Sequence, residues 1–567
     1  MGFRLLLIYP PEGAGESPLD PRRVSDADYL FFPYGLLTIA GDLRDQGIEV
    51  EVLNLICLSC EQAMAVVRRH PAEIIGLTCY TFQRHAAARL GEAIKREFPR
   101  SHVTVGGSHV TPMPQEWLNH YPAFDSVVVG EGEATMRELV AAVRDGRPTE
   151  GISGTAYRSD SQAILAPPRA RLANLDVLGK PWRYYDYAAL LTSRGCPAEC
   201  TFCSSPSFWN RKVTFRSVEN VMEEVEELVV RRGQRLLAIK DDTFTAHRGH
   251  VLAICQAVRE RGLEFRWSCD SRIDYLNAEV LQAMRRAGCT RISVGIESGS
   301  PDLLQQMKKR LDLDRAEEIT SQARNLGLPI RYFLIVGTPG ETPEILRATA
   351  EFVKRARPTS YLATCHSTYP GTEDFFTAAK QGLLSLQDYF TCKDEFYMMR
   401  HFHGLSEAAQ RELAELHPQR TVDCPVAPFT LEEREAVYAR HADMLLNALD
   451  LVDLYITTGR LHDAERVLRD ASLRIGRESS LVEQYLACLQ CALGNVESAR
   501  RRLNYAHARD PRDTLIQLQY WTVFRPEIGA IDPKSMAERM LANLRNAGTY
   551  LFLHDGKRNS VAPITAV

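Results

Sequence analysis

The chain has 567 residues, of which 45% are hydrophobic and 25% are charged, as in ordinary globular proteins. Its formal net charge of −4 argues against nucleic acid as a partner, since phosphate-binding proteins are usually basic. No apolar run is long enough to span a bilayer, and the first nine residues lack the pattern of a signal peptide. We therefore expect a cytoplasmic protein of three to four domains with no membrane partner.

Residues 1–150 alternate between short apolar or β-branched runs and segments with helical spacing. This rhythm predicts a doubly wound, Rossmann-like parallel sheet. The expected strands are Arg4–Tyr9, Ile48–Leu53, Ile74–Cys79, Val103–Gly106 and Ser126–Val129. The expected helices are Gly35–Gln46, Glu61–Arg69, Arg84–Phe98, Gln115–His120 and Thr135–Asp145. Ligands of such sheets bind beyond the carboxyl ends of the strands.

Two glycine-bearing segments lie at those carboxyl ends, Gly106-Gly107-Ser108-His109 and Gly130-Glu131-Gly132-Glu133. Glycine allows a ligand to approach the backbone closely. Glycine pairs also end strands without any ligand, so these segments alone do not assign a site.

Residues 151–188 read as a linker, with a hairpin expected from Thr155–Tyr157 and Ala163–Leu165. The α/β alternation resumes over 189–375, and its six βα units predict a partial barrel open on one side. The expected barrel strands are Ala189–Thr192, Leu236–Lys240, Glu264–Ser268, Arg291–Gly295, Ile330–Val336 and Ser360–Cys365. The helices expected between them include Val218–Arg232, His250–Arg261, Ala278–Ala287 and Ala316–Leu326.

The last third of the chain changes character. Residues 376–430 form a connector with an aromatic and histidine cluster at 397–403, and 431–530 are all-helical. The segment Thr458–Ala464 aligns with Leu493–Ala499, with glycine and alanine in matching places. The spacing of the two segments along the chain resembles the period of tetratricopeptide hairpins, which is about 34 residues. We expect a short helical cap that seals the open barrel, with peptide docking as the alternative, and a tail over 531–567.

Three of the 14 cysteines share one short segment, Cys196, Cys200 and Cys203. Thiolates at C-x3-C-x2-C spacing on one loop can hold three corners of a [4Fe–4S] cluster and leave the fourth iron open for a ligand. The alternative is a zinc site, which would need a fourth ligand that the nearby sequence does not offer.

This segment resembles the radical SAM superfamily, and further motifs extend the resemblance. Phe202 stands where that family often has an aromatic residue. Three other segments end the second, fourth and fifth barrel strands, namely Ile239–Phe244, Gly295–Gly299 and Gly337–Thr342. The resemblance implies a barrel whose chemistry lies at its carboxyl-terminal end.

The resemblance also implies residues that bind S-adenosylmethionine. Glu297 and Asp241 are candidates for the ribose or ammonium group, and Arg216 for the carboxylate. The full set of expected contacts is Phe202, Arg216, Asp241, Asp242, Glu297, Ser298, Gly337, Pro339, Gly340 and Glu341. Exposed charged residues at loop ends are otherwise solvated or cap helices.

Residues 1–150 resemble the cobalamin-binding half of cobalamin-dependent radical SAM enzymes. The Asp-x-His-x-x-Gly motif that supplies a cobalt ligand in cobalamin mutases is absent. The resemblance therefore implies base-off cobalamin without a histidine ligand, with residues 80–83 near its lower face. The expected contacts are Tyr34, Gly35, Tyr80, Thr81, Phe82, Gln83, Gly106, Gly107, Ser108, Gly130, Glu131 and Gly132.

The implied activity is methyl transfer from S-adenosylmethionine, through methylcobalamin, to a carbon of a natural product, peptide or metabolite. A flavodoxin or ferredoxin type of electron donor is implied as a partner. Tyr369 and His366 are candidates to face the substrate. Three alternatives remain: cyclisation or ring rearrangement without net methylation, methylthio transfer with a second cluster at Cys57, Cys60 and Cys79, and a non-enzymatic helical-repeat protein.

Overall fold

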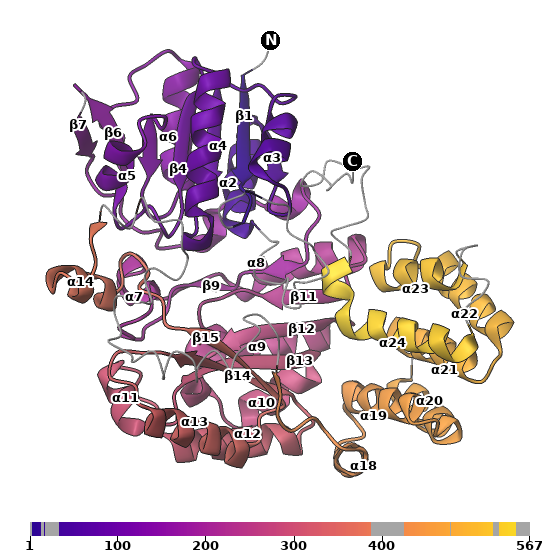
Figure 1. The fold of residues 1–567 in the computed structure, drawn as a ribbon. Helices are drawn as coiled ribbons and strands as arrows, with labels where there is room; N and C mark the ends of the chain where they lie inside the picture. The colour runs from indigo at the N-terminus through magenta and orange to yellow at the C-terminus, as the bar shows by residue number, and fades with distance from the viewer. Residues whose placement is uncertain are drawn as a thin grey trace.

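The computed structural model describes residues 3–12, 16, 33–160, 162–386, 390, 424–476, 478–524 and 532–550. It has two α/β parts, one above the other, and a helical part beside the lower one (Figure 1). The aromatic and histidine cluster at 397–403 and most of the expected 531–567 tail lie outside the described residues.

The first sheet has seven strands in the order β2-β1-β3-β4-β5-β6-β7. Their bounds are β1 Arg4–Tyr9, β2 Glu49–Asn54, β3 Ile74–Thr78, β4 His102–Gly106, β5 Ser126–Val128, β6 Thr155–Ser159 and β7 Gln162–Leu165. Strands β1 to β5 pair in parallel, as expected. The predicted hairpin β6–β7 adds to this sheet in antiparallel register. The sheet therefore continues past residue 150.

Alternate side chains of β1 explain why this sheet is covered on both faces. Leu5 and Leu7 belong to one buried cluster, with α2 (Tyr34–Asp45) and α6 (Glu133–Arg144). Leu6 and Ile8 belong to another. The second cluster includes residues of α3 Cys60–Val67, α4 Arg84–Glu97 and α5 Pro114–His120. Strands β1 and β3 are buried on both faces and read as continuous apolar runs, which made them visible in the sequence.

The second sheet has the order β16-β15-β14-β13-β12-β11-β8, and β8 to β15 are parallel. Its strands are β8 Ala189–Leu190, β11 Leu236–Ile239, β12 Arg266–Ser271, β13 Cys289–Glu297, β14 Ile330–Val336, β15 Ser360–Cys365 and β16 Cys424–Pro425. The helices along it are α8 Val218–Glu226, α9 Arg248–Glu260, α10 Ala278–Arg286, α11 Pro301–Gln306, α12 Leu313–Asn325 and α13 Pro343–Ala356. The first strand is shorter than expected, because the chain leaves the sheet to form β9 (Ser193–Arg194).

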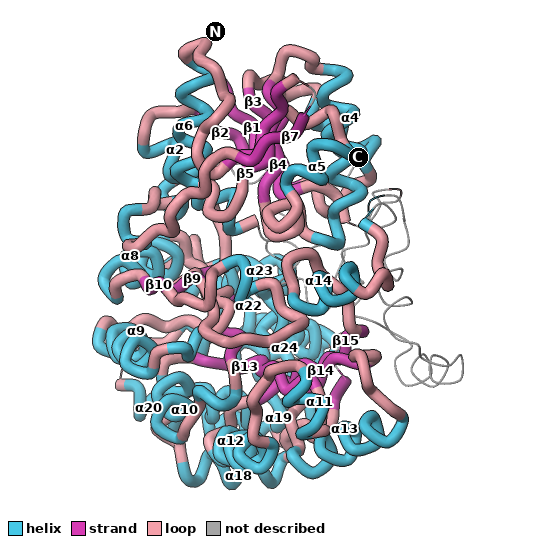
Figure 2. The backbone as a smooth tube through the Cα atoms, turned by 90° about the vertical axis from the view of Figure 1, so that its left-hand side faces the viewer, coloured by secondary structure: helices cyan, strands magenta, loops and turns pink. Residues whose placement is uncertain are grey.

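Helix α14 (Glu373–Lys380) joins the two α/β parts, between which it lies (Figure 2). Its Phe375 and Ala378, with Leu384 and Phe390, belong to the buried cluster that holds Trp117 of α5. Part of the expected connector is therefore core of the first domain.

Within the described residues, the helical part consists of α18 and three successive helix pairs. The helices are α18 Leu431–Arg440, α19 Leu445–Thr457, α20 Leu461–Ile475, α21 Ser480–Ala492, α22 Val496–Arg509, α23 Thr514–Phe524 and α24 Pro533–Tyr550. The aligned Gly459 and Gly494 end α19 and α21 with positive φ angles of 78° and 81°, a conformation that favours glycine after a helix. No described helix is both long and apolar enough to cross a membrane.

Long-range polar contacts fix where the helical part sits. Arg235, just before β11, pairs with Asp510 and Asp513 at 2.9 and 2.8 Å. Arg266, the first residue of β12, donates to the Leu544 carbonyl. The helices thus cover the amino-terminal ends of the strands, on the opposite side of the sheet from α7 (Ser205–Phe208) and α14 (Figure 1). The helical part expected to seal the open barrel therefore lies at the amino-terminal ends of its strands.

Arg285 of α10 is 2% exposed and makes the most buried of these contacts. It donates to Asn447 at 2.9 and 3.0 Å and pairs with Asp450 at 2.5 Å. We predict that Arg285→Ala lowers the free energy of unfolding by about 3 kcal/mol, because the buried Asn447 side-chain oxygen loses its donors and Asp450 keeps only Arg434 among its described ion-pair partners. Chemical unfolding followed by circular dichroism measures this.

The neighbouring Arg286 is the matched control, because its pair with Asp443 is solvent-exposed on both sides. Arg286→Ala should cost less than about 1 kcal/mol. Equal unfolding midpoints for the two variants would contradict the assigned interface.

Candidate functional site

The three clustered cysteines lie on a loop that is closed at its base by a short ladder. Strand β9 pairs antiparallel with β10 (Thr214–Phe215), so residues 195–213 leave and return at one place. Gly195 opens the loop with a φ of 106°, and a Cβ there would lie 2.1 Å from the Lys212 carbonyl oxygen. Only glycine fits this close approach.

The described cysteines are all free thiols. The Thr243 hydroxyl donates to the Cys196 sulfur at 3.3 Å, and the Arg272 guanidinium donates to the Cys200 sulfur at 3.6 Å. Burial raises the pKa of Cys203 to about 12, and it also raises that of Cys200, against the opposing charges of Lys309 and Arg272. Two of the three sulfurs therefore accept a hydrogen bond from a neighbouring side chain.

Three thiols on one loop, with cationic and hydroxyl donors beside them, are a donor set that fits an iron–sulfur cluster. In a cluster each thiolate binds a different iron. A zinc ion instead gathers four ligands around one point. Over the residues that the structure describes, no three His, Cys, Asp or Glu side chains are gathered in that way.

A buried ion pair lies beside Cys200. Glu297 was expected at this site from the sequence, but its partner Lys309 was not. Lys309 and Glu297 are 2.9 Å apart, and each side chain is at most 7% exposed. Burial alone would lower the pKa of Lys309, but the Glu297 carboxylate outweighs it and raises that pKa. A Cβ at Gly295 would lie 2.2 Å from the Glu297 carboxylate, so glycine makes room for the pair.

Glu297 also carries backbone strain, because it is a non-glycine residue with a φ of 67°. It lies at the end of β13, where the register with β14 shifts. Its carboxylate is committed to Lys309, so Glu297 acts on a ligand only together with that lysine.

Asp241 and Asp242 anchor the chain as it enters the cysteine loop. Asp241 accepts hydrogen bonds from the Thr192 N–H at 2.7 Å and the Ser193 hydroxyl at 2.6 Å, and burial raises its pKa to about 6. Asp242 accepts from the Gly195 N–H at 3.0 Å. Both residues were expected to contact a ligand, and both also hold the loop in place.

The Arg216 side chain makes its contacts with other residues of the protein interior. It is 6% exposed and pairs with the fully buried Glu224 of α8. The Tyr187 hydroxyl donates to the same carboxylate at 2.5 Å, and that of Tyr34 at 3.3 Å. Arg216 is not among the described residues that line the cavity below, which disagrees with its expected role as a carboxylate ligand.

The remaining motif residues form turns behind the strand ends. Ser298 is fully buried, with its hydroxyl 3.2 Å from that of Thr349. The Gly337 N–H donates to the Glu341 carboxylate and closes the turn that holds Pro339 and Gly340. Phe202 is partly buried.

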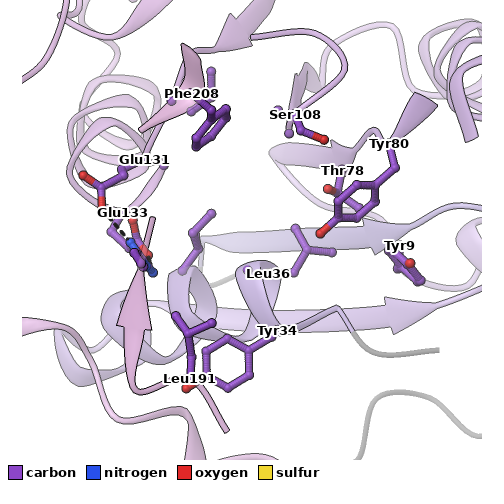
Figure 3. A pocket seen from close by; sticks show the side chains of 18 of the residues that line it. Tyr9, Tyr34, Leu36, Thr78, Tyr80, Ser108, Glu131, Glu133, Leu191 and Phe208 are labelled. Carbon is purple, nitrogen blue, oxygen red and sulfur yellow. Dashed lines mark hydrogen bonds and ion pairs between the residues drawn. The ribbon is translucent and has the colours of Figure 1, made fainter. Parts of the chain in front are cut away.

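A cavity of about 660 Å³ lies between the carboxyl ends of the first sheet and the cysteine loop. Figure 3 shows Tyr80 and Ser108 reaching into it from the first sheet, opposite Phe208. Of the residues expected to contact cobalamin, ten line it: Tyr34, Gly35, Tyr80, Phe82, Gly106, Gly107, Ser108, Gly130, Glu131 and Gly132. Cys203, Asp241 and Asp242 line the same cavity.

Thr81 and Gln83 point elsewhere. The Thr81 hydroxyl lies 3.2 Å from Nδ1 of the buried His109, and the Gln83 amide donates to the Pro10 carbonyl at 2.8 Å. No histidine is among the described residues that line the cavity. Gly107, with a φ of 116°, lets the first glycine loop pack on Cys79, whose carbonyl oxygen would lie 2.6 Å from an added Cβ.

Arg194 of β9 forms part of the cavity wall that the sequence did not reveal. It pairs with Glu131 at 2.9 Å and with Glu133 at 2.5 Å, and all three side chains are at most 9% exposed (Figure 3). Burial would raise the pKa of Glu133, but Arg194 outweighs it and holds that pKa below its usual value. The repeated Gly-Glu sequence of the second glycine loop was the available signal for this ion pair. Its partner Arg194 immediately precedes the cysteine loop. Further lining residues that the sequence did not reveal include Tyr9, Thr78, Phe208, Trp209, Lys240 and Asp270.

The two candidate substrate residues differ in position. His366 is 1% exposed, and its Nε2 lies 2.8 Å from the Asp374 carboxylate at the start of α14. Tyr369 is 45% exposed. Neither is among the described residues that line the cavity.

Comparison with known proteins identifies the family of this chain. Residues 190–353 match the radical SAM superfamily, and residues 23–140 match the B12 binding domain. An uncharacterized methyltransferase of Pyrococcus horikoshii is 30% identical over 387 residues, which cover 65% of this chain and 84% of that protein. The chain belongs to the cobalamin-dependent radical SAM methyltransferases.

Solved structures share the fold of this methyltransferase. TsrM from Kitasatospora setae, with tryptophan substrate and an S-adenosylmethionine analog bound, is 19% identical, with a TM-score of 0.55 over 77% of this chain and 88% of its own. OxsB, with aqua-cobalamin and S-adenosylmethionine bound, is 14% identical, with a TM-score of 0.52 over 96% of this chain and 84% of its own. The two matched domains are the two α/β parts that enclose the cavity.

Glu341 gives the methyltransferase a testable pH response. Burial raises its pKa to about 7, against the N–H groups of Gly337 and Thr338. A carboxyl group with a raised pKa stabilises the fold fully below its unfolded pKa, and this stability is lost as the pH rises through about 7. We predict that Glu341→Gln becomes more stable relative to the wild type from pH 5 to pH 8, by up to about 3 kcal/mol.

Thermal unfolding of the cofactor-free protein measures this difference. Glu344→Gln is the control, because its backbone N–H and the Thr342 hydroxyl hold the pKa of Glu344 below its usual value. That variant should show no such widening between pH 5 and pH 8. A constant difference for Glu341→Gln would refute the prediction.

Proposed function

We propose that the protein methylates a carbon atom of a small molecule that is held between two cofactors in the interdomain cavity. The observation that carries this proposal is a single cavity bordered both by the glycine loops of the first sheet and by Cys203 and Asp242. A volume of about 660 Å³ lies within the range of small-molecule sites.

In this proposal Cys196, Cys200 and Cys203 hold a [4Fe–4S] cluster. When bound, the cluster and S-adenosylmethionine supply one-electron chemistry for hydrogen abstraction, and cobalamin supplies the methyl group. The protein's own part is to orient these groups and to exclude water. Thr243 and Arg272 donate hydrogen bonds to two of the cysteine sulfurs, and these bonds would help to orient the sulfurs toward a cluster.

The residues behind the strand ends form the proposed S-adenosylmethionine site. The Lys309–Glu297 pair offers a cation and a carboxylate next to Cys200, which suits an amino acid head group. The turn from Gly337 to Glu341 offers backbone for the nucleoside. Arg216 is left out of this set, since its guanidinium is already held by Glu224.

The glycine loops form the proposed cobalamin site. Tyr80 would contact the cobalamin in this proposal, and its ring stacks on Phe82 with 5.8 Å between centroids. Because no described histidine lines the cavity, we propose base-off cobalamin without protein imidazole. The expected signature is a cob(II)alamin electron paramagnetic resonance spectrum that lacks nitrogen coupling from imidazole.

Two features of the architecture belong to the proposal. The six parallel strands from β8 to β15 act as a partial barrel, and the helix pairs α19–α20 and α21–α22 are tetratricopeptide-like repeats. A flavodoxin or ferredoxin type of protein supplies electrons. The repeats lie at the amino-terminal ends of the strands. We therefore favour a role in supporting the barrel over peptide docking at the cavity.

Methylthio transfer is disfavoured by where the other cysteines lie. Cys57 and Cys79 are at most 3% exposed in the core of the first domain. Cys60 begins α3, with its sulfur 3.8 Å from the Ala86 carbonyl oxygen. These are positions of packing residues.

One experiment distinguishes methyl transfer from cyclisation or rearrangement without methylation. With S-adenosylmethionine that carries a trideuterated methyl group, methyl transfer predicts a product heavier by the labelled methyl, together with 5′-deoxyadenosine. A product without the label, formed with the same 5′-deoxyadenosine, would favour the alternative chemistry.

We predict that replacing Cys196, Cys200 and Cys203 together by Ala reduces bound iron from about four atoms per chain to background. Cobalamin binding should persist, because most of its contacts lie on the first sheet. Iron quantification and the cobalamin absorption spectrum measure both. Cys255→Ala is the control, since Cys255 is buried in α9, and it should keep its iron. Full iron in the triple variant would disprove the cluster assignment.

A further inference from the structure

A second hollow opens on the other side of the cysteine loop. It has a volume of about 560 Å³. Cys200 and Cys203 line it, together with Pro206, Gly371 and Phe376. The loop therefore separates two spaces: Cys203 borders both of them, and Cys200 borders the second.

Helix α14 and the loop before it form the outer wall of this hollow. The Ser207 hydroxyl donates to the Gly371 carbonyl at 2.6 Å, and the Asp374 N–H donates to the Thr201 carbonyl at 3.1 Å. Lys308 pairs with Glu373 at 2.7 Å. These contacts fix the distance between the wall and the cysteines, so the hollow is a built feature of the surface.

The rim of this hollow carries a surplus of positive charge. Its cations are Arg211, Lys308, Arg310 and Lys380, and its carboxylates are Glu199 and Glu373. Glu199 is shared between Arg211 and Arg310, and Lys380 is exposed at the end of α14. Two positive charges remain over the cluster-bearing loop.

We propose that this hollow is the docking face for an acidic protein that carries a one-electron redox centre. The inference rests on the proposed cluster at Cys196, Cys200 and Cys203. One electron passes from the reduced flavin or iron–sulfur centre of the donor to the cluster. The donor is oxidised by one electron, the cluster is reduced by one, and no bond is formed or broken in this step.

The two spaces beside the cysteine loop suit different functions. The interdomain cavity is lined by the glycine loops and must admit the methyl donor and the substrate. Electron transfer weakens steeply with distance, so a protein donor needs an approach that reaches a cluster ligand from outside. The hollow gives that approach at Cys200 and Cys203.

The size and charge of the rim suit a transient encounter. Electron-transfer complexes bury small interfaces, and opposite charges speed their formation more than they strengthen it. Phe376, which lines the hollow and is 54% exposed, provides an apolar contact among these charged side chains. Such a face favours fast binding and fast release.

The test is the rate at which the reconstituted enzyme's cluster is reduced by a purified flavodoxin in its hydroquinone form, measured by anaerobic stopped-flow absorbance. Lys380→Glu with Arg310→Glu should slow this reduction at least about tenfold at low salt. The difference should shrink at high salt, because screening weakens attraction between exposed charges. With the methyl viologen radical cation as reductant, the same variant should react as fast as the wild type or faster.

The matched control reverses two charges far from the hollow. Arg466 and Arg469 are exposed on α20, and Arg466→Glu with Arg469→Glu should leave both rates unchanged. Binding of the metal-free variants to immobilised oxidised flavodoxin, measured by biolayer interferometry, gives a readout without turnover. Weaker binding only for the hollow variant is expected.

Equal rates and equal binding for the two double variants would overturn the docking face. A loss of rate with both reductants at unchanged binding would also overturn it. A wild-type protein that takes up no iron would instead refute the proposed cluster, so the two failures are distinguishable.

Discussion

The structure around the cavity depends on one buried ion network, Arg194 with Glu131 and Glu133. Removing these charges from water costs several kcal/mol for each ion, which their mutual attraction only partly returns. Such a network contributes little net stability, but it strongly disfavours any other arrangement of the same groups. Because Arg194 immediately precedes the cysteine loop and both glutamates belong to the second glycine loop, the network fixes the position of one domain's site against that of the other.

Several polar residues at the strand ends hold the groups that line the proposed cofactor sites in place. Asp241 fastens the start of the cysteine loop, and Glu297 is held by Lys309 in a strained backbone conformation. Strain of this kind persists only where the surroundings over-determine it. The site is therefore built in two layers, and the inner layer consists largely of cysteines, glycines and aromatic residues.

The parts of the fold that the sequence predicts well are those set by local pattern. The strands Arg4–Tyr9 and Ile330–Val336 have the predicted bounds, because buried parallel strands are largely continuous apolar runs. Ser360–Cys365 also has its predicted bounds, although it is only partly buried. The role of Arg216 could not be read in this way, since its buried network includes Tyr34, a residue far away in the chain. The position of the helical part was also hidden. It depends on pairs such as Arg235 with Asp513, and no local spacing encodes such a contact.

The packing of α14 has a consequence for how the chain is made. Phe375, Ala378, Leu384 and Phe390 complete a hydrophobic face that begins with residues of the first domain. The Tyr121 hydroxyl donates to the Phe390 carbonyl at 3.4 Å across 269 residues of sequence. Domains usually fold from the amino terminus during synthesis, so the ribosome must release the whole barrel before this face is covered. The apolar surface around Trp117 is then exposed on the nascent chain for that interval, and a truncated first domain carries the same exposed surface permanently.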